Sequence, residues 1–172
     1  VGAINPVTNR IYVNLGSGGD ITTAVLDGAT NATLTTIAYS KPYTGVVAVN
    51  PVTNRIYAAS SAFVTLFVLD GTSYNVIAEL TFDWPNFAVA VNPVTNRIYV
   101  ANAAFPSVTV IDGATNTILE TISIAWTGGT YIGTFANTIA VNPITNRIYV
   151  PRLDGATVTV IDGATNTVLT HV

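Results

Sequence analysis

The sequence predicts an all-β protein built from four repeated sheets, and three observations lead to this fold class. The first is a sequence motif, NPVTNR or NPITNR, that occurs four times and ends at Arg10, Arg55, Arg97 and Arg147. The second is a shorter motif, LDG or IDG, that follows each copy of the first motif at a nearly fixed distance. The third is the pattern around these motifs, where short runs rich in β-branched residues alternate with polar, glycine-containing turns.

Each repeat contains four runs of strand length. In the third repeat these runs are FAVAVN (87–92), RIYVAN (97–102), SVTVID (107–112) and TILETISI (117–124). The first two are joined by NPVTN, in which Pro93 presets φ and Asn96 adopts a positive φ at low cost. The last two are joined by DGATN, where we expect Asp112 to cap the turn and Gly113 to take a left-handed conformation. One repeat is therefore expected to form a four-stranded antiparallel meander.

The period of the repeat predicts how these sheets are arranged. The repeated arginines are 45, 42 and 50 residues apart, a period typical of propeller blades. A meander cannot bury both of its faces alone, but sheets stacked around an axis can. We therefore predict one β-propeller domain over 1–172, with blades at about 1–40, 41–83, 84–127 and 128–172. A closed four-bladed ring is favoured because a single chain then buries every blade face; half of an eight-bladed ring and an open arc are the alternatives.

The strand motifs of the third repeat resemble those of a known family. Tyr99–Asn102 reads YVAN and Val108–Asp112 reads VTVID, which is similar to the YVTN-repeat β-propellers of bacterial and archaeal surface proteins. The resemblance covers the whole chain, although 57–60 reads YAAS and 149–152 reads YVPR in the second and fourth repeats. It implies a propeller fold and an extracellular or cell-surface location, and it implies no particular activity.

The composition excludes several kinds of partner. Only 9% of the residues are charged, six of them basic, and the net charge is −3. No basic patch for nucleic acid or anionic lipid can be assembled from so few residues. No stretch approaches the ~20 apolar residues of a membrane helix, so we expect no membrane insertion. Weak charge also removes a common barrier to self-association.

An arginine and an aspartate recur together in every repeat. The pairs are Arg10 with Asp27, Arg55 with Asp70, Arg97 with Asp112, and Arg147 with Asp162. Arginine opens the second strand and aspartate closes the third, so antiparallel pairing brings them opposite each other. They could form a charged ring for an ion or polar ligand, or ion pairs that fix the hairpin register. We prefer the structural interpretation because the pairs recur with the turns, and we expect Arg97→Ala to destabilise the fold only mildly.

The connections opposite the repeated turns differ from blade to blade, and they contain both tryptophans. Loops that are not needed to fold a blade can acquire contacts, so this variable face is the candidate binding face. The candidate binding residues are Lys41, Tyr43, Asp83, Trp84, Trp126, Tyr131 and Arg152. The aromatic side chains could stack on sugar rings or anchor a protein partner, or they could fill gaps between blades.

Residues for catalysis or metal binding are scarce. His171 is the only histidine, there is no cysteine, and the sequence contains no catalytic triad, zinc set, phosphate-binding loop or calcium loop. We expect no enzyme activity, no cofactor and no metal site. The NAT sequence at Asn31 matches a glycosylation sequon, either used or matched by chance.

These features favour a non-enzymatic extracellular module with a structural or interaction role. We expect it to associate with copies of itself into a surface layer or filament, or to bind surface glycans or other surface proteins. The alternative is a ligand-binding propeller that holds a carbohydrate or protein with the aromatic loops of the variable face.

Overall fold

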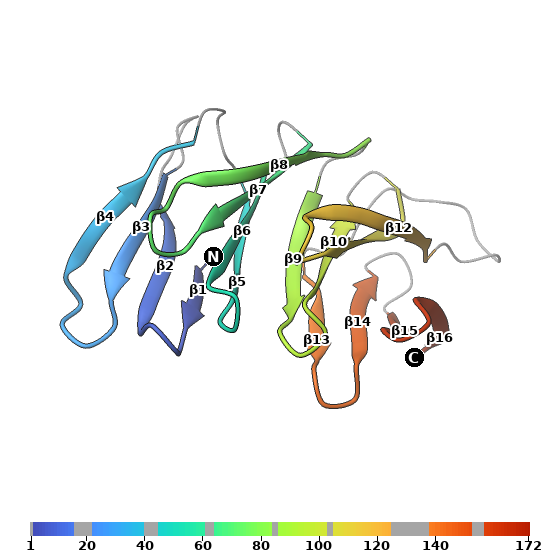
Figure 1. Cartoon of the computed structure of the whole chain (residues 1–172). Coiled ribbons are helices and arrows are strands. Elements are labelled where there is room, and N and C mark those ends of the chain that lie inside the picture. Colours follow the sequence, from blue (N-terminus) through green and yellow to red (C-terminus); the bar gives the residue numbers. More distant parts are fainter. Residues whose placement is uncertain are drawn as a thin grey trace. The chain divides into compact units, whose positions relative to one another are not determined.

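The computed structural model describes residues 2–15, 22–39, 45–60, 64–83, 86–102, 105–124, 138–152 and 157–172. All regular secondary structure in these ranges is β-strand. The strands form four antiparallel sheets, each made of four consecutive strands in chain order (Figure 1). The predicted all-β fold and the four-stranded meander are confirmed.

The four sheets are numbered along the chain, and each lies within one of the predicted blades. Sheet 1 contains β1 (Gly2–Asn5), β2 (Arg10–Leu15), β3 (Thr22–Asp27) and β4 (Thr33–Ile37). Sheet 2 contains β5 (Val46–Asn50), β6 (Arg55–Ser60), β7 (Thr65–Asp70) and β8 (Val76–Thr81). Sheet 3 contains β9 (Asn86–Asn92), β10 (Arg97–Asn102), β11 (Ser107–Asp112) and β12 (Thr117–Ser123). Sheet 4 contains β13 (Ala140–Asn142), β14 (Arg147–Arg152), β15 (Thr157–Asp162) and β16 (Thr167–His171).

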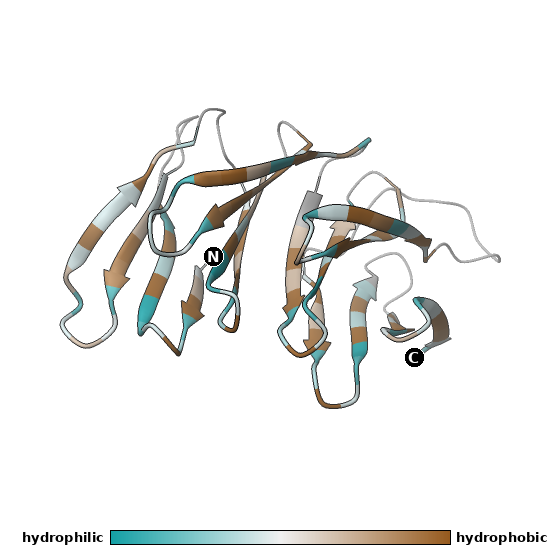
Figure 2. Ribbon diagram, in the orientation of Figure 1, coloured by the Kyte–Doolittle hydropathy of each residue, from teal (hydrophilic) through white to brown (hydrophobic). Residues whose placement is uncertain are grey.

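The alternation of side chains gives each sheet two different faces. Residues opposite each other in an antiparallel register share a face, so Tyr99 lies on one face with Ala90 and Val110. Ile98 lies on the other face with Ile111. We call these the tyrosine face and the isoleucine face. Corresponding positions are Tyr12, Tyr57, Tyr99 and Tyr149 on the first, and Ile11, Ile56, Ile98 and Ile148 on the second. Figure 2 shows the apolar bands along the strands.

The chain divides into two compact units, Val1–Pro85 and Asn86–Val172. In the first unit the tyrosine face of sheet 1 packs against the isoleucine face of sheet 2. Its buried cluster includes Tyr12, Val25 and Ile37 from sheet 1, and Ile56, Ala58, Phe67 and Leu69 from sheet 2. Burial of each large apolar side chain contributes about 1.5–3 kcal/mol, so this junction is a main source of stability for the unit.

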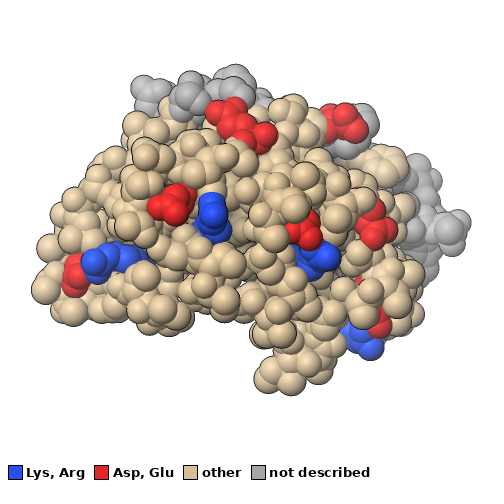
Figure 3. Space-filling model, in the orientation of Figure 1, with Lys and Arg blue, Asp and Glu red and all other residues tan. Residues whose placement is uncertain are grey.

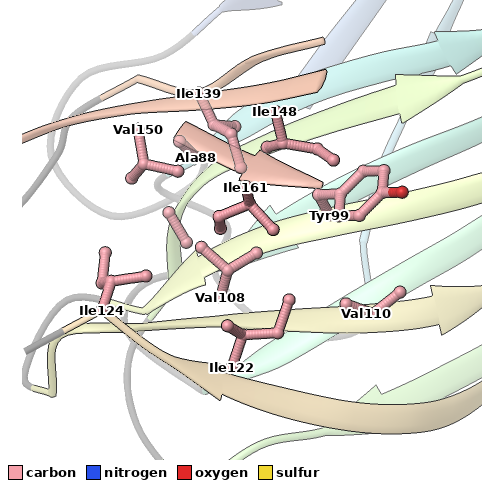
Figure 4. Close-up of a cluster of buried hydrophobic side chains, with 11 residues drawn as sticks. Ala88, Tyr99, Val108, Val110, Ile122, Ile124, Ile139, Ile148, Val150 and Ile161 are labelled. Carbon is pink, nitrogen blue, oxygen red and sulfur yellow. The ribbon is translucent and has the colours of Figure 1, made fainter. Parts of the chain in front are cut away.

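The second unit repeats the same junction with sheets 3 and 4. Its cluster includes Tyr99, Ala101, Val108 and Val110 from the tyrosine face of sheet 3, and Ile148, Val150 and Ile161 from the isoleucine face of sheet 4 (Figure 4). The side chains of the two sheets point toward one another in this cluster. The repeated sequence therefore builds one kind of contact twice, tyrosine face against isoleucine face.

The NPVTN turn begins and ends with a structurally required asparagine. The Asn5 Oδ1 atom accepts hydrogen bonds from the backbone N–H groups of Val7, at 3.0 Å, and Thr8, at 3.3 Å. Asn50, Asn92 and Asn142 make the same pair of bonds in the other sheets. The last asparagine is left-handed in every copy, with φ between 51° and 53°. Asn96 thus behaves as predicted, since asparagine tolerates this region better than most residues.

The glycine of the DGATN turn brings the two turns of a sheet together. The Gly113 N–H donates to the Asn96 carbonyl oxygen at 2.9 Å. A Cβ atom on Gly113 would lie 2.3 Å from Asn96 Oδ1 and 2.8 Å from the Asn96 carbonyl oxygen. The expectation that Gly113 is left-handed is wrong: Asn116 takes that conformation, with φ 55°. Close approach, and not a special φ, requires glycine here.

Gly28, Gly71 and Gly163 make the same contact with the first turns of their own sheets. The two motifs therefore recur together because the NPVTN and DGATN turns form one structural unit at the same end of each sheet. In sheet 2 the left-handed place of the second turn is taken by Tyr74, with φ 60°, and Tyr74 also packs against the core of the first unit.

Candidate interaction surfaces

The repeated charges lie at the turn end of each sheet. Arg10 Nη1 lies 2.6 Å from Asp27 Oδ2, and Arg97 forms an ion pair with Asp112. Arg147 with Asp162 makes the corresponding pair in sheet 4. Arg55 lies directly opposite Asp70 in the register of sheet 2. Figure 3 shows basic and acidic side chains next to one another on a surface that is mostly uncharged.

Each of these aspartates also closes its own turn. Hydrogen bonds from the backbone N–H groups of Thr30 and Ala29 are the main reason that the pKa of Asp27 is lowered. The backbone N–H of Ser73 has the same leading effect on the pKa of Asp70.

For Asp162 and Asp112, hydrogen bonds from backbone N–H groups and from the paired arginine both lower the pKa. For Asp162 the backbone N–H of Ala164 lowers the pKa most, followed by the hydrogen bond from Arg147. For Asp112 the hydrogen bond from Arg97 comes first, and the pKa falls to about 2. The aspartates are therefore engaged in turn capping and in the arginine contacts.

Asparagine side chains connect neighbouring sheets within each unit. Asn5 Nδ2 of sheet 1 donates to Asn54 Oδ1 of sheet 2 at 2.9 Å. Asn92 Nδ2 of sheet 3 donates to Asn146 Oδ1 of sheet 4 at 2.8 Å. Asn5 and Asn92 are fully buried. This link was not predicted, although the first and last asparagines of the NPVTN turn are the same in all four internal copies.

Other polar contacts join sheets at different places. Asn14 Nδ2 donates to the Gly45 carbonyl oxygen at 2.7 Å, and Asn166 Nδ2 donates to Glu120 Oε1 at 2.6 Å. Asn102, the asparagine of the YVAN strand, donates within sheet 3 to Ser107 Oγ at 2.8 Å and to Thr109 Oγ1 at 3.1 Å. Asn102 is therefore a buried structural residue that ties β10 to β11.

Most of the predicted binding residues lie outside the part of the chain that the structure describes. These are Lys41, Tyr43, Trp84, Trp126 and Tyr131. Arg152 ends β14, and its side chain is also outside the description. Asp83 is exposed just after β8. The proposed ligand role of this set stays a prediction.

Tyr39 and Phe82, in connections between successive sheets, serve packing, whereas Phe105, in the connection between β10 and β11, is 46% exposed. Tyr39 contacts the Phe67 ring, with centroids 5.4 Å apart, and its hydroxyl lies 2.8 Å from Thr23 Oγ1. Phe82 is buried. For Tyr39 this favours the interpretation that aromatics fill the space between blades.

The positive φ of Val64, in the connection between β6 and β7, was not predicted. Val64, just before β7, has φ 48°, which is unusual for a β-branched residue. Its carbonyl oxygen accepts a hydrogen bond from the Phe82 N–H at 2.8 Å, which helps to hold the conformation.

The sequence also singled out His171 as the only histidine and Asn31 as a possible glycosylation site. His171 Nδ1 lies 3.0 Å from Thr159 Oγ1. Asn31 is exposed at a left-handed turn position. Within the described ranges, no group of three or more His, Cys, Asp or Glu side chains is arranged to hold a metal ion.

No helix in the described part of the chain is long and apolar enough to cross a membrane.

Comparisons with known proteins bear on the fold. A scan against protein-family models finds no match, and a search of curated proteins finds no relative. Among solved structures, hydrazine synthase of Kuenenia stuttgartiensis matches with a TM-score of 0.80 and 17% sequence identity over 99% of this chain. The match covers 47% of the hydrazine synthase chain, so this protein spans about half of that length. At this identity the likeness shows a propeller-like all-β fold and nothing about activity.

Proposed function

We propose that this protein is a non-enzymatic structural or interaction module that associates with copies of itself. The observation that carries the proposal is the exposure of many large apolar side chains on a weakly charged surface. Exposed examples at the turns are Val7, Val52, Val94 and Ile144, at 74%, 72%, 75% and 94%. Examples on the outer strands are Leu34, Val76, Ile77, Ile118, Leu119 and Leu169.

Apolar groups gathered on a surface favour association, because contact removes them from water. Single exposed apolar residues are ordinary, but here they recur at the same place in successive sheets. Only 9% of the residues carry charge, so electrostatic repulsion between copies is weak. Both properties support assembly into a layer or filament.

The polar side chains described above support a role without catalysis. The repeated aspartates cap turns, and Asn5 and Asn92 link sheets. These groups are already engaged in holding the fold, as expected for a scaffold. We also propose membership of the YVTN-repeat family and an extracellular or cell-surface location, on the YVAN and VTVID strands of sheet 3 and the propeller-like fold.

The proposal is tested by the native mass as a function of concentration. Sedimentation velocity and light scattering over about two decades of protein concentration should reveal larger species that grow with concentration, as mass action requires. Electron microscopy of the same samples should show discrete rings, sheets or filaments. A monomer of constant mass over the whole range would contradict the proposal.

A further inference from the structure

The fourth strand of each sheet forms one of its two edges. The strand order places β4, β8, β12 and β16 last in sheets 1 to 4, so among the described residues no further strand of the same sheet lies beside them. The first strands form the other edges, and within a unit they lie next to one another, β1 beside β5 and β13 beside β9. A free edge offers a row of backbone N–H and C=O groups to any further strand.

The exposure of these edges does not depend on which face of the sheet is covered. One extra residue bulges out of each fourth strand: Leu34, Ile77, Leu119 and Leu169. Sheet 1 is covered on its tyrosine face and sheet 2 on its isoleucine face, yet Leu34 and Ile77 are 46% and 43% exposed. A sheet packed against either face therefore leaves the edge accessible.

Bulges and charges protect three of the four edges from pairing with another strand. Natural proteins use both devices for this purpose. The bulge interrupts each fourth strand near the turn that precedes it. Beyond the bulge, three strands carry an ionisable residue: Glu79, Glu120 and His171. β4 continues instead with Thr35, Thr36 and Ile37, so it is the fourth strand without an ionisable side chain.

The backbone groups of Thr36 point away from β3. In an antiparallel pair, residues that exchange two hydrogen bonds with the partner strand alternate with residues whose N–H and C=O groups point outward. Val158 and Val172 exchange two such bonds, at 2.7 and 3.0 Å, so His171 faces outward in β16. Thr36 has the corresponding place in β4, two residues after the bulge in both strands, and its side chain is exposed.

We propose that β4 pairs antiparallel with β4 of a second copy of this chain about a two-fold axis at Thr36, so that the Thr36 N–H of each copy donates to the Thr36 carbonyl oxygen of the other. The inference rests on the proposed function, since it names an edge through which copies associate. Two-fold pairing sets threonine opposite threonine, a favourable cross-strand pair. The same pairing of β8 would set Glu79 opposite Glu79, which is unfavourable.

A second copy fits this edge better than an unrelated peptide. Peptides that add a strand to a sheet obtain affinity from the backbone, and they obtain specificity from pockets or charges that select their side chains. β4 presents threonines and the exposed Leu34, which are neutral. A two-fold contact is closed after two copies, so it makes a dimer, and growth into a layer or filament needs a second contact.

Charge substitutions at Thr36 test the two-fold pairing. Thr36→Glu and Thr36→Lys each set like charges opposite each other, so each variant alone should dimerise about fivefold or more weakly than the wild type. An equimolar mixture sets lysine opposite glutamate. The mixture should form the heterodimer at concentrations where each variant alone is monomeric, which sedimentation velocity with one labelled variant would detect.

A backbone substitution tests the hydrogen bonds of the same contact. Thr36→Pro removes the outward N–H, and proline is tolerated where an edge N–H does not serve its own sheet. The dimer should be lost while the fold remains. The matched controls are Thr121→Glu and Thr121→Pro, at the same place in β12, which should dimerise like the wild type. Hydrogen exchange of the wild-type Thr36 amide should slow as the dimer forms.

Other outcomes would overturn the inference in distinguishable ways. If the Thr36 variants dimerise as well as the wild type, association occurs through other surfaces, and the proposed function survives while this contact does not. If the wild type is monomeric at every concentration, the proposed function fails as well. If the lysine and glutamate variants are monomeric but do not combine, or if the Thr121 variants lose the dimer equally, β4 does not pair with β4. Circular dichroism of each variant would check that it is folded.

Discussion

At the scale of single residues, the repeated polar side chains each perform more than one structural task. Asp112 accepts hydrogen bonds from the N–H groups of Ala114 and Thr115, at 2.8 and 3.0 Å, and also pairs with Arg97. Asn92 accepts from the N–H groups of its own turn and donates to the next sheet. Substitution of such a residue removes a turn contact and a longer-range contact together.

The aspartates give the fold a predictable acid sensitivity. The pKa of Asp112 is about 2 in the folded protein, below the ordinary value near 3.8, and those of Asp27, Asp70 and Asp162 are also lowered. Between these values the unfolded chain binds more protons than the folded one. The stabilisation is therefore complete above about pH 4 and is lost as the pH falls toward about 2.

We predict that the free energy of unfolding in urea falls as the pH is lowered from about 4 to about 2, with little change from these carboxyls between about pH 5 and 7. Asp112→Asn should be less stable at neutral pH and should lose less stability on acidification than the wild type. Asp83→Asn, at an exposed position just after β8, is the control. Equal acid losses in Asp112→Asn and the wild type would contradict the prediction.

At the scale of elements, the sequence predicted the strands and turns well because both depend on local rules. Alternating β-branched runs and Asn-Pro or Asp-Gly turns define hairpins without knowledge of distant contacts. The contact of Gly113 with Asn96 was not predicted, because it joins two turns separated in sequence. The Asn5–Asn54 and Asn92–Asn146 links were missed for the same reason. The β-bulges between the third and fourth strands, as at Val110/Ile111, also had no local signal.

The paired turns lead to a prediction about glycine. Gly113→Ala would place a methyl group 2.3 Å from Asn96 Oδ1 and 2.8 Å from the Asn96 carbonyl oxygen. The turns must then separate, which weakens the Gly113 N–H bond to that carbonyl. We expect a loss of about 1–3 kcal/mol in the free energy of unfolding, the usual cost of forcing atoms into a packed site.

Urea denaturation of Gly113→Ala measures this loss, and Ala114→Ser is the control because Ala114 is exposed one residue further along. A Gly113→Ala protein as stable as the wild type would show that the two turns are not tightly coupled.

At the scale of the whole molecule, the unequal exposure of equivalent residues is the most informative observation. Ile11 and Ile148 occupy the same place in the repeat, yet only Ile148 is fully buried. Within its own unit sheet 4 packs through its isoleucine face, whereas sheet 1 packs through its tyrosine face. The repeated sequence alone does not decide which face of a sheet is used. Closure into a four-bladed ring stays a prediction.

The low charge of the surface predicts how the proposed self-association responds to salt. Only 9% of the residues are charged, and Arg10 and Arg147 are each paired with an aspartate of their own sheet. Sodium chloride screens interactions between exposed charges, with a Debye length of about 10 Å at 0.1 M, but it hardly affects apolar burial. We expect the dissociation constant from sedimentation equilibrium to change less than about threefold between ~0.05 and ~0.5 M sodium chloride. Sodium sulfate should instead strengthen assembly, because excluded salts favour burial of apolar surface. A dissociation constant that rises tenfold or more with sodium chloride would show that charges hold the copies together, and would direct attention to the arginines at the turns.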